Sequence, residues 1–368
     1  MVAGRRRHVA LFMPTVHGGG AERAMLNFSR ELVRLGMQVD LVVGNFEGPL
    51  RELVPAGVRV VSFGASRLSY GIVSLIRYLN RERPAALYST ITNANVIAAV
   101  AGRVAKSPTR IIVRHSNVPI SEPKTTWRRR LTTRLLPATY KLADGIIAVS
   151  EGVAQELCTL APAVSSRVRV IPTPVLSPEV LEQGMEPAVH PWLAADAAEP
   201  VVLAAGRLQK QKGFGTLLKA FALVRQRQKA RLIIIGEGDE RQNLESCVES
   251  LGLQTDVSLP GFQSNPFSFM NQARVFVLAS EFEGLPNVLI QAMAFGTPVV
   301  ATDCKSGPRE ILEDGRLGAL VPVGDVAELA RAIERTLALP KQMHAALHVQ
   351  ARYGAEVATR QYLALAGL

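Results

Sequence analysis

The sequence predicts an α/β protein with two doubly wound, Rossmann-like domains. The chain has 368 residues, which is too long for one ordinary core and suits two domains of about 150 to 200 residues each. Short apolar runs alternate with helical patterns along both halves, as expected for buried parallel strands joined by crossover helices. A proline-rich stretch separates the two halves.

The apolar runs are bounded by turn residues and are short enough to be strands buried on both faces. In the first half we predict strands at residues 8–13, 39–43, 58–63, 86–89, 110–113 and 145–149. In the second half we predict strands at 201–205, 230–235, 257–259, 275–278, 298–302 and 319–321. Helices are expected near 213–228, 240–251 and 289–295.

The domain boundary is expected in residues 172–200, where six prolines interrupt any regular register. We assign residues 1–175 to an N-terminal domain, 176–200 to a linker and 201–345 to a C-terminal domain. Parallel sheets of this kind bind ligands at the carboxyl ends of their strands. The ligand is therefore expected in the cleft between the domains.

Composition favours an ordered, cytoplasmic protein. Hydrophobic residues make up 48% of the chain and charged residues 20%. No run of 18 or more apolar residues occurs, and the N-terminus enters its first apolar run without a small-residue cleavage site. Cys158, Cys247 and Cys304 are widely spaced and have no paired Cys or His neighbours, so we expect reduced, packed thiols.

The positive charge is concentrated in the first half. Residues 1–180 contain 24 Lys and Arg against 11 Asp and Glu, whereas residues 181–368 contain 18 against 20. A basic domain attracts nucleic acid, an anionic membrane face or a phosphorylated substrate. Motifs for nucleic-acid binding are absent from the sequence, so a nucleic-acid partner is not expected.

Residues 280–312 place a carboxylate, an amide and two turn-forming loops around one short predicted helix. Glu283 and Gln291 lie eight positions apart, and Gly284, Pro286 and Asn287 between them should delay the start of the next helix. Glu283 is then expected just before a helix N-terminus, where free N–H groups and the helix dipole favour a polar or anionic ligand. We predict a ligand site here.

The string Glu283-Gly-Leu-Pro-Asn-Val-Leu-Ile-Gln291 resembles the E-x7-E region of retaining family 4 glycosyltransferases, which have the GT-B fold. The resemblance implies that Glu283 contacts the transferred sugar and that residue 291 holds the ribose of a nucleotide-sugar donor. Gln291 departs from the family's second Glu and offers a neutral group in place of a carboxylate. Further donor contacts are implied for Gly284, Leu285, Asn287 and Val288.

The resemblance covers nearly all of the chain and is strongest over residues 203–323. It implies that a C-terminal helix, residues 346–368, crosses back to the N-terminal domain. Residues 206–213, GRLQKQKG, match the family's phosphate-binding segment. Arg207 and Lys212 are the candidate cations, because fixed positive charge stabilises the leaving diphosphate more in the transition state than in the ground state. Lys210 is expected to face solvent.

A glycine-rich loop, residues 18–23, follows the first predicted strand and opens a helix. Glycines let backbone amides approach a phosphate or sugar closely, although simple turn geometry also explains such a loop. The resembling family has a GGxE-like loop here that contacts donor or acceptor. Gly19, Gly20 and Glu22 match it.

His115 closes a first-half strand. A lone His at a strand end is commonly structural, but the resemblance implies a position near the reactive carbon of the sugar. The candidate catalytic residues are thus Glu283, His115, Arg207 and Lys212. The loops at Gly236 and Phe262 are expected to meet the donor nucleoside, largely through the backbone.

No metal or cofactor is expected. The sequence contains no Asp-x-Asp pair, and Arg207 and Lys212 would supply the charge that Mg²⁺ or Mn²⁺ supplies in Asp-x-Asp enzymes. The resemblance favours a front-face mechanism in which the leaving phosphate takes the acceptor's proton. Glu283 would then position the sugar rather than attack it.

Residues 124–136, KTTWRRRLTTRLL, have the pattern of a basic amphipathic helix. An apolar stripe of this kind is equally explained by core packing. The basic first half favours contact with an anionic inner leaflet, where a lipid-linked sugar acceptor would lie. The candidate acceptor or membrane residues are Glu22, Trp127, Arg128, Arg129 and Arg130.

We therefore predict a retaining, metal-independent glycosyltransferase. It would move a hexose or N-acetylhexosamine from a nucleotide diphosphate, with UDP expected, to a glycan or lipid-linked acceptor in cell-surface polysaccharide or glycolipid synthesis. One alternative is a nucleotide-sugar epimerase of the same fold, which needs no acceptor. The other is a non-catalytic nucleotide-sugar binding subunit, suggested by Gln291.

Overall fold

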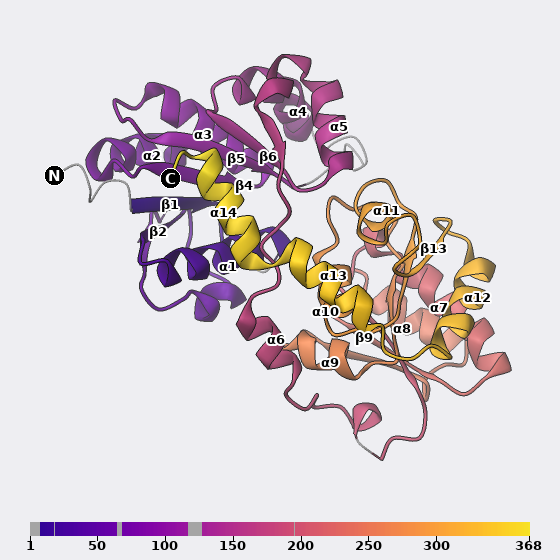
Figure 1. The fold of residues 1–368 in the computed structure, drawn as a ribbon. Helices are drawn as coiled ribbons and strands as arrows, with labels where there is room; N and C mark the ends of the chain where they lie inside the picture. The colour runs from indigo at the N-terminus through magenta and orange to yellow at the C-terminus, as the bar shows by residue number, and fades with distance from the viewer. Residues whose placement is uncertain (1–7, 18, 65–67, 117–126, 195) are drawn as a thin grey trace. The chain divides into compact units, whose positions relative to one another are not determined.

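The fold is shown in Figure 1 as a computed structural model, which describes residues 8–17, 19–64, 68–116, 127–194 and 196–368. The chain divides into two compact units. The first unit comprises Met1–Val175 and Ala355–Leu368, and the second comprises Leu176–Gly354. Each contains one parallel sheet with crossover helices, so the predicted fold class is confirmed.

The first unit has a seven-stranded sheet in the order β3-β2-β1-β4-β5-β6-β7. Its strands are β1 His8–Met13, β2 Gln38–Val43, β3 Val58–Ser62, β4 Ala86–Thr90, β5 Arg110–His115, β6 Gly145–Ala148 and β7 Val168–Val170. The first six match the predicted runs to within two residues. The sequence did not predict β7, because this edge strand is three residues long and none of its side chains is fully buried.

The helices of the first unit include a C-terminal one that is distant in sequence. They are α1 Gly20–Arg34, α2 Leu68–Glu82, α3 Thr92–Val104, α4 Trp127–Tyr140, α5 Glu151–Leu160 and α14 Ala355–Leu365. Tyr362 of α14 is fully buried, with its ring centroid 4.9 Å from that of Phe28 on α1. Tyr88 on β4 donates a 2.7 Å hydrogen bond to the Tyr362 carbonyl. The last helix is therefore part of this unit's core.

The second unit has a six-stranded sheet in the order β10-β9-β8-β11-β12-β13. Its strands are β8 Val201–Ala205, β9 Arg231–Ile235, β10 Val257–Gly261, β11 Val275–Leu278, β12 Val299–Thr302 and β13 Ala319–Val321. Its helices are α6 Pro178–Gly184, α7 Phe214–Arg227, α8 Arg241–Ser250, α9 Pro266–Gln272, α10 Asn287–Ala294, α11 Pro308–Ile311, α12 Val326–Leu337 and α13 Met343–Tyr353.

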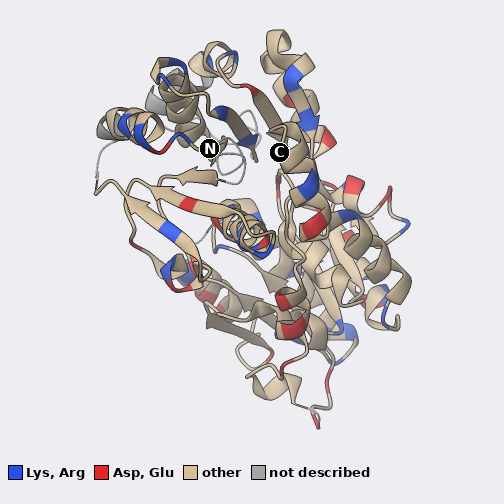
Figure 2. Ribbon diagram, turned by 60° about the vertical axis from the view of Figure 1, so that its left-hand side comes forward, with Lys and Arg blue, Asp and Glu red and all other residues tan. Residues whose placement is uncertain are grey.

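Apolar spacing explains how these helices cover the sheet. On α7, Leu217, Phe221 and Val224 lie at i, i+4 and i+7, and all three are fully buried. They share one core cluster with Ile333 of α12 and with alternate residues of the central strands. The strands of both sheets are mainly uncharged in Figure 2, as expected for strands buried on both faces.

The structure differs from the predicted linker and C-terminal helix. Residues 176–200 belong to the second unit, where Pro178 and Pro191 begin short helices instead of interrupting an extended linker. Asn265 and Asn271 hold α6 by donating to the carbonyls of Gln183 and Gly184. The C-terminal region forms two helices that meet at Gly354, with α13 in the second unit and α14 in the first.

Both sheets have the same reversal of strand order. Each begins with a central strand, β1 or β8, proceeds to one edge and then resumes on the other side of that strand, at β4 or β11. In doubly wound sheets, ligands bind outside the carboxyl ends of the strands at this reversal. The predicted donor and catalytic residues lie at or after the carboxyl ends of β1, β5, β8, β9, β10 and β11, whereas predicted residues 127–130 lie on α4.

Candidate functional site

A buried ion pair lies at the reversal point of the second unit. Lys212 Nζ, in the loop after β8, is 2.6 Å from Glu283 Oε1, in the loop after β11. The two side chains are only 18% and 8% exposed. Ser280 Oγ donates a 2.7 Å hydrogen bond to the same carboxylate oxygen. The structure thus brings together two of the predicted catalytic residues.

The backbone fixes this pair from both loops. Gly213 has a left-handed φ of 63°, and a Cβ atom there would lie 2.0 Å from the Ala279 carbonyl oxygen, so only glycine permits this approach. Gln211 donates through its side chain to the Phe282 carbonyl at 2.8 Å. Thr302 Oγ1 in turn donates to the Ser280 carbonyl at 2.6 Å. Lys212 and Glu283 are therefore held on preorganised loops.

One carboxylate oxygen is left for a ligand. Lys212 and Ser280 both bind Glu283 Oε1, and the part of the chain that the structure describes offers Oε2 no hydrogen bond. A carboxylate oxygen that is not already bound by a side chain can accept a hydrogen bond from a sugar hydroxyl. This arrangement provides a hydrogen-bond acceptor beside a fixed ammonium group.

The remaining cations of the β8 loop are exposed. Arg207 and Lys210 both face solvent, as predicted for Lys210. Lys210, Gln211 and Lys212 form a short 3₁₀ turn that leads through Gly213 into α7. Arg207 lies on the same loop as Lys212.

The segment predicted to hold the donor surrounds Glu283. Helix α10 begins at Asn287, two residues before the predicted start, so Glu283 precedes its N-terminus as expected. Gly284 and Leu285 are buried, whereas Asn287, Val288 and Gln291 are half-buried along the first turns of the helix. The structure gives Glu283 and Gln291 no hydrogen bond to each other. Their separate positions suit two different groups of one ligand.

The loops after β9 and β10 adjoin the β8 loop. A Cβ atom on Gly236 would lie 1.9 Å from the Gly206 carbonyl oxygen, and Gly236 N–H donates to the Gly261 carbonyl at 3.0 Å. Phe262, which follows β10, is 50% exposed. An exposed aromatic ring at a strand end can stack on a planar base. These loops extend the site away from Glu283.

The sequence did not single out Ser280 as a site residue, nor did it place Cys304 close to the site. A serine at a strand end has no distinctive pattern, although Ser280 orients the central carboxylate. Cys304 follows β12 and is 4% exposed. Burial, and then the negative charge of Glu283, raise the pKa of the Cys304 thiol to about 12. Cys304 is thus a protonated thiol close to the site, consistent with the predicted reduced and packed state.

The glycine loop of the first unit has the expected position. Helix α1 begins at Gly20, with Gly19 as the preceding cap residue, and Arg23 N–H donates to the Gly19 carbonyl at 3.1 Å. Glu22 lies in the first turn and is 8% exposed. Gly18 lies outside the described residues. The loop therefore leads into a helix N-terminus at the carboxyl end of β1.

His115 is more enclosed than a surface ligand-binding side chain. It ends β5, is 2% exposed, and its Nδ1 lies 3.0 Å from the Tyr140 hydroxyl. Burial, and then the charge of Arg114, lower the pKa of His115 to about 4. The imidazole is therefore neutral at physiological pH.

The predicted basic helix is only partly described. Helix α4 begins at Trp127, and residues 124–126 of the predicted helix lie outside the described residues. The side chains of Trp127, Arg128, Arg129 and Arg130 also lie outside them. None of the described helices is long and apolar enough to cross a membrane. Nor do the described residues contain a group of three or more His, Cys, Asp and Glu that could hold a metal ion.

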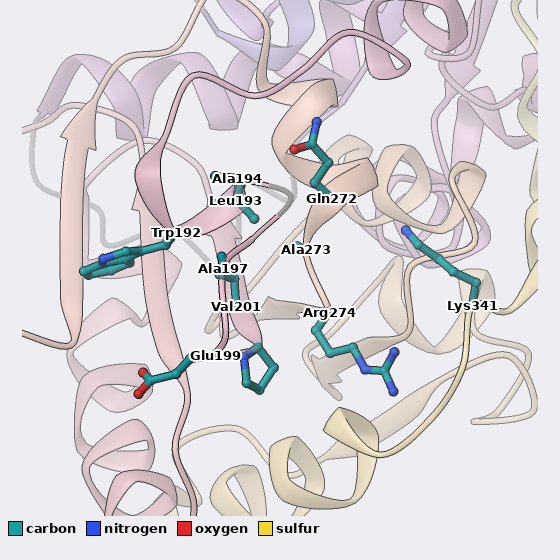
Figure 3. Close-up of a pocket in the computed structure, with 11 residues that line it drawn as sticks. Trp192, Leu193, Ala194, Ala197, Glu199, Val201, Gln272, Ala273, Arg274 and Lys341 are labelled. Atoms are coloured by element: carbon teal, nitrogen blue, oxygen red, sulfur yellow. The ribbon is translucent and has the colours of Figure 1, made fainter.

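A separate pocket of about 260 Å³ lies near the amino ends of β8 and β11 (Figure 3). Trp192 and Glu199 line one side, and Arg274 and Lys341 line the other. Burial, and then the charge of Arg274, lower the pKa of Lys341 to about 8, and Lys341 Nζ donates to Thr297 Oγ1 at 2.8 Å. None of the predicted site residues lines this pocket. It is therefore distinct from the Lys212–Glu283 site.

Two family models match the chain in succession. The model for Glycosyltransferase Family 4 matches residues 18–175, and the model for Glycosyl transferases group 1 matches residues 188–352. Sucrose-phosphate synthase from Thermosynechococcus elongatus has a similar structure, with a TM-score of 0.82 over 98% of each chain and 21% identity. Anabaena HepE, solved with UDP and glucose, has a TM-score of 0.78 and 19% identity, covering 98% of this chain and 100% of HepE.

Two proteins of similar sequence are also named as glycosyltransferases. The N-acetylgalactosamine-N,N'-diacetylbacillosaminyl-diphospho-undecaprenol 4-alpha-N-acetylgalactosaminyltransferase of Campylobacter jejuni is 25% identical over 350 residues, which are 89% of this chain and 90% of that protein. An uncharacterized glycosyltransferase of Methanocaldococcus jannaschii is 32% identical over 205 residues, which are 55% of this chain and half of that protein's length.

The two parallel-sheet units have the GT-B fold, which they share with these solved structures. The chain belongs to the group 1 glycosyltransferases of family 4, because the two models together match most of its length.

Proposed function

We propose that this chain is a retaining, metal-independent glycosyltransferase that moves a hexose or N-acetylhexosamine from a UDP-sugar to a glycan or lipid-linked acceptor. The observation that carries the proposal is the buried Lys212–Glu283 pair at the carboxyl ends of β8 and β11. Family membership supports the transfer of a sugar. The charges and hydrogen bonds of the site support the roles proposed below for Lys212, Arg207 and Glu283.

Lys212 and Arg207 would stabilise the leaving diphosphate. Negative charge builds on the β-phosphate as the bond to the sugar breaks, and fixed cations in a buried site stabilise that charge most in the transition state. Lys212 is already immobilised by Glu283, so little reorganisation is needed. This use of side-chain cations is the basis for proposing that no metal is required.

Glu283 would position the transferred sugar. Its Oε2 is open to accept a hydrogen bond from a sugar hydroxyl, while Lys212 and Ser280 hold Oε1. In the proposed front-face reaction the bond from the anomeric carbon to phosphate breaks, and a bond to the acceptor oxygen forms on the same face. The acceptor proton passes to the leaving phosphate oxygen. No enzyme nucleophile is needed.

UDP is proposed as the donor nucleotide because HepE, a structure of the same fold, was solved with UDP and glucose. Gln291 would meet the ribose with a neutral amide. Such a contact is weaker than the charge-assisted bond of a carboxylate. We therefore expect modest donor affinity rather than loss of donor binding.

A lipid-linked acceptor in polysaccharide or glycolipid synthesis is proposed from the relatives. The Campylobacter enzyme is named for a diphospho-undecaprenol acceptor, and Rhizobium meliloti LpsE, 38% identical over 146 residues, is named for lipopolysaccharide core biosynthesis. The basic first half of the sequence supports peripheral binding to an anionic cytoplasmic leaflet. Cosedimentation with anionic vesicles at low and high salt would test this point.

The central experiment follows nucleotide diphosphate release from UDP-, GDP- and ADP-sugars in EDTA, with and without a membrane lipid extract. We expect release from a UDP-sugar, increased by lipid, and transfer with retained anomeric configuration by NMR of the product. Glu283→Ala and Lys212→Ala should lower the rate of release at least about a hundredfold, whereas Lys210→Ala should change it little. Release that requires added Mg²⁺ or Mn²⁺ would contradict the metal-independent mechanism.

The same assay separates the alternatives. An epimerase would convert the sugar nucleotide without an acceptor and would form no glycoside. A non-catalytic subunit would bind a donor tightly without releasing nucleotide under any condition. Either result would overturn the proposed transfer.

A further inference from the structure

A buried chain of hydrogen bonds ends at His115 in the first unit. Ser89 on β4 donates to Asn95 Oδ1 on α3 at 2.8 Å. Asn95 Nδ2 lies 2.9 Å from both the Arg114 carbonyl and the Tyr140 hydroxyl. The Tyr140 hydroxyl in turn lies 3.0 Å from His115 Nδ1. Ser89, Asn95 and Tyr140 are fully buried, and His115 is 2% exposed.

The direction of these bonds follows from the Arg114 carbonyl, which can only accept. The atom of Asn95 that faces it must therefore be the amide nitrogen, and the Ser89 hydroxyl must donate to the amide oxygen. The two amide protons then go to the Arg114 carbonyl and to the Tyr140 oxygen. Tyr140 therefore accepts from Asn95.

Tyr140 retains one proton to donate. Among the described residues its only other hydrogen-bond partner is His115 Nδ1, which must then accept. In the opposite arrangement, His115 Nδ1 would donate, and the buried Tyr140 hydroxyl would have no acceptor for its proton. Leaving a buried donor without a partner is unfavourable.

We propose that Asn95 and Tyr140 are positioning residues that fix His115 as the tautomer with its proton on Nε2. A neutral imidazole that accepts at Nδ1 carries its single proton at Nε2. The low pKa of His115, caused by burial and by Arg114, favours this neutral ring at physiological pH. None of the described residues forms a hydrogen bond with Nε2.

This tautomer defines what His115 can do in the proposed reaction. Nε2–H can donate to an oxygen atom of the sugar or acceptor. Because Nε2 already carries the proton, it has no free lone pair with which to remove another one. The inferred role thus rests on the proposed transfer, and it agrees with a mechanism in which the leaving phosphate, not a histidine, takes the acceptor proton. The tautomer itself does not depend on any substrate.

Nitrogen-15 NMR of the histidine-labelled protein tests the tautomer directly. The chain has six histidines, and the signals missing from His115→Gln identify His115. We expect an unprotonated shift for Nδ1 and a protonated shift for Nε2 at neutral pH. A protonated Nδ1 at the His115 signals of the wild-type protein would overturn the inference.

Tyr140→Phe removes the hydroxyl that selects the tautomer. We expect intermediate shifts at both ring nitrogens, because the ring then divides between two tautomers. Tyr88→Phe is the matched control, since it removes another buried hydroxyl bond in the same unit, from Tyr88 to the Tyr362 carbonyl. It should leave the His115 shifts unchanged. An unchanged His115 spectrum in folded Tyr140→Phe would refute the positioning role of Tyr140.

Activity measurements then test whether the reaction uses the Nε2–H group of His115 as a hydrogen-bond donor. His115→Gln keeps an N–H donor and should retain kcat/KM within about tenfold, whereas His115→Phe should lose about a hundredfold. Equal losses in both variants would show that the donated proton does not matter. If no nucleotide sugar supports transfer at all, the proposed function fails. The NMR result still decides the tautomer of His115.

Discussion

Two buried carboxylates, Asp40 in the first unit and Glu283 in the second, are bound in different ways. Asp40 lies inside β2 and is fully buried. Its Oδ1 accepts from Arg59 Nε at 2.8 Å, and its Oδ2 accepts from His8, Arg59 and Tyr78. Glu283 lies beyond the carboxyl end of β11, and Lys212 and Ser280 both bind the same one of its oxygens.

The difference separates a charge used for folding from one available to a ligand. Both Asp40 oxygens are bound by side chains from β1, β3 and α2, so removing the charge should weaken several packed elements at once. Glu283 holds only the loops of its own site and keeps Oε2 open. We therefore expect Asp40 substitutions to lower stability and Glu283 substitutions to lower activity.

Glu283→Gln should have the largest effect on the reaction. The amide keeps the size of the side chain but loses the charge that orders Lys212 and the acceptor that meets the sugar. We expect kcat to fall about 10³-fold, the scale for loss of one preorganised polar group in an active site. The free energy of unfolding should change by less than about 2 kcal/mol. A large loss of stability with normal kcat would show that Glu283, like Asp40, serves folding and not the reaction.

Asp40→Asn should reverse this pattern. We expect a loss of about 2 kcal/mol in the free energy of unfolding, measured by urea denaturation at pH 7, because the buried His8 and Tyr78 side chains lose a charged hydrogen-bond acceptor. The folded fraction should keep normal kcat. Asp40→Asn would contradict the account if it lowered kcat as strongly as Glu283→Gln.

The pH dependence of stability sharpens the role of Asp40. Burial would raise its pKa, but hydrogen bonds from His8, Arg59 and Tyr78 outweigh burial and hold the pKa of Asp40 well below its usual range. Its contribution is therefore present above the unfolded pKa of about 3.9 and is lost as pH falls below that value. Urea denaturation at successively lower pH should show the wild type and Asp40→Asn converging. A constant difference down to pH 3 would refute this linkage.

Lys212→Ala should lower kcat about 10²-fold, because the leaving diphosphate loses its fixed cation. Lys210→Ala is the matched control, since Lys210 lies two residues away in the same turn and faces solvent. It should change kcat less than about twofold. Equal effects of the two substitutions would show that general positive charge matters, and not the placement of Lys212 beside Glu283.

Gln291→Glu should have the smallest effect. A carboxylate restores a charge-assisted hydrogen bond to a ribose hydroxyl, so we expect KM for the donor to fall by up to about tenfold with kcat nearly unchanged. Initial rates over a range of UDP-sugar concentrations would measure this. A raised KM would indicate that the site is adapted to the neutral side chain.

Most of the fold could be predicted because parallel strands buried on both faces are continuous apolar runs. The short edge strand β7 has no such run. The prolines of residues 176–200 predict a linker, because proline commonly interrupts regular structure. Pro178 and Pro191 instead begin short helices in the second unit, and sequence alone does not distinguish these two uses of proline.

The site could be predicted only as separate motifs. Sequence reasoning selected both Lys212 and Glu283, but their contact joins positions 71 residues apart and depends on the sheet order. Ser280 and Tyr140 could not be selected, because a single Ser or Tyr acquires its role only from the neighbours that folding provides. The same holds for Asp40, whose three partners come from three elements.

A crystal structure with UDP bound would show whether the Lys212–Glu283 site holds the nucleotide diphosphate. We predict that the diphosphate binds Lys212 Nζ and Arg207, with uracil at the loops of Gly236 and Phe262 and with Glu283 Oε2 facing the place of the sugar. The Asp40 network should be unchanged. A nucleotide bound elsewhere, with the Lys212–Glu283 pair untouched, would contradict the account.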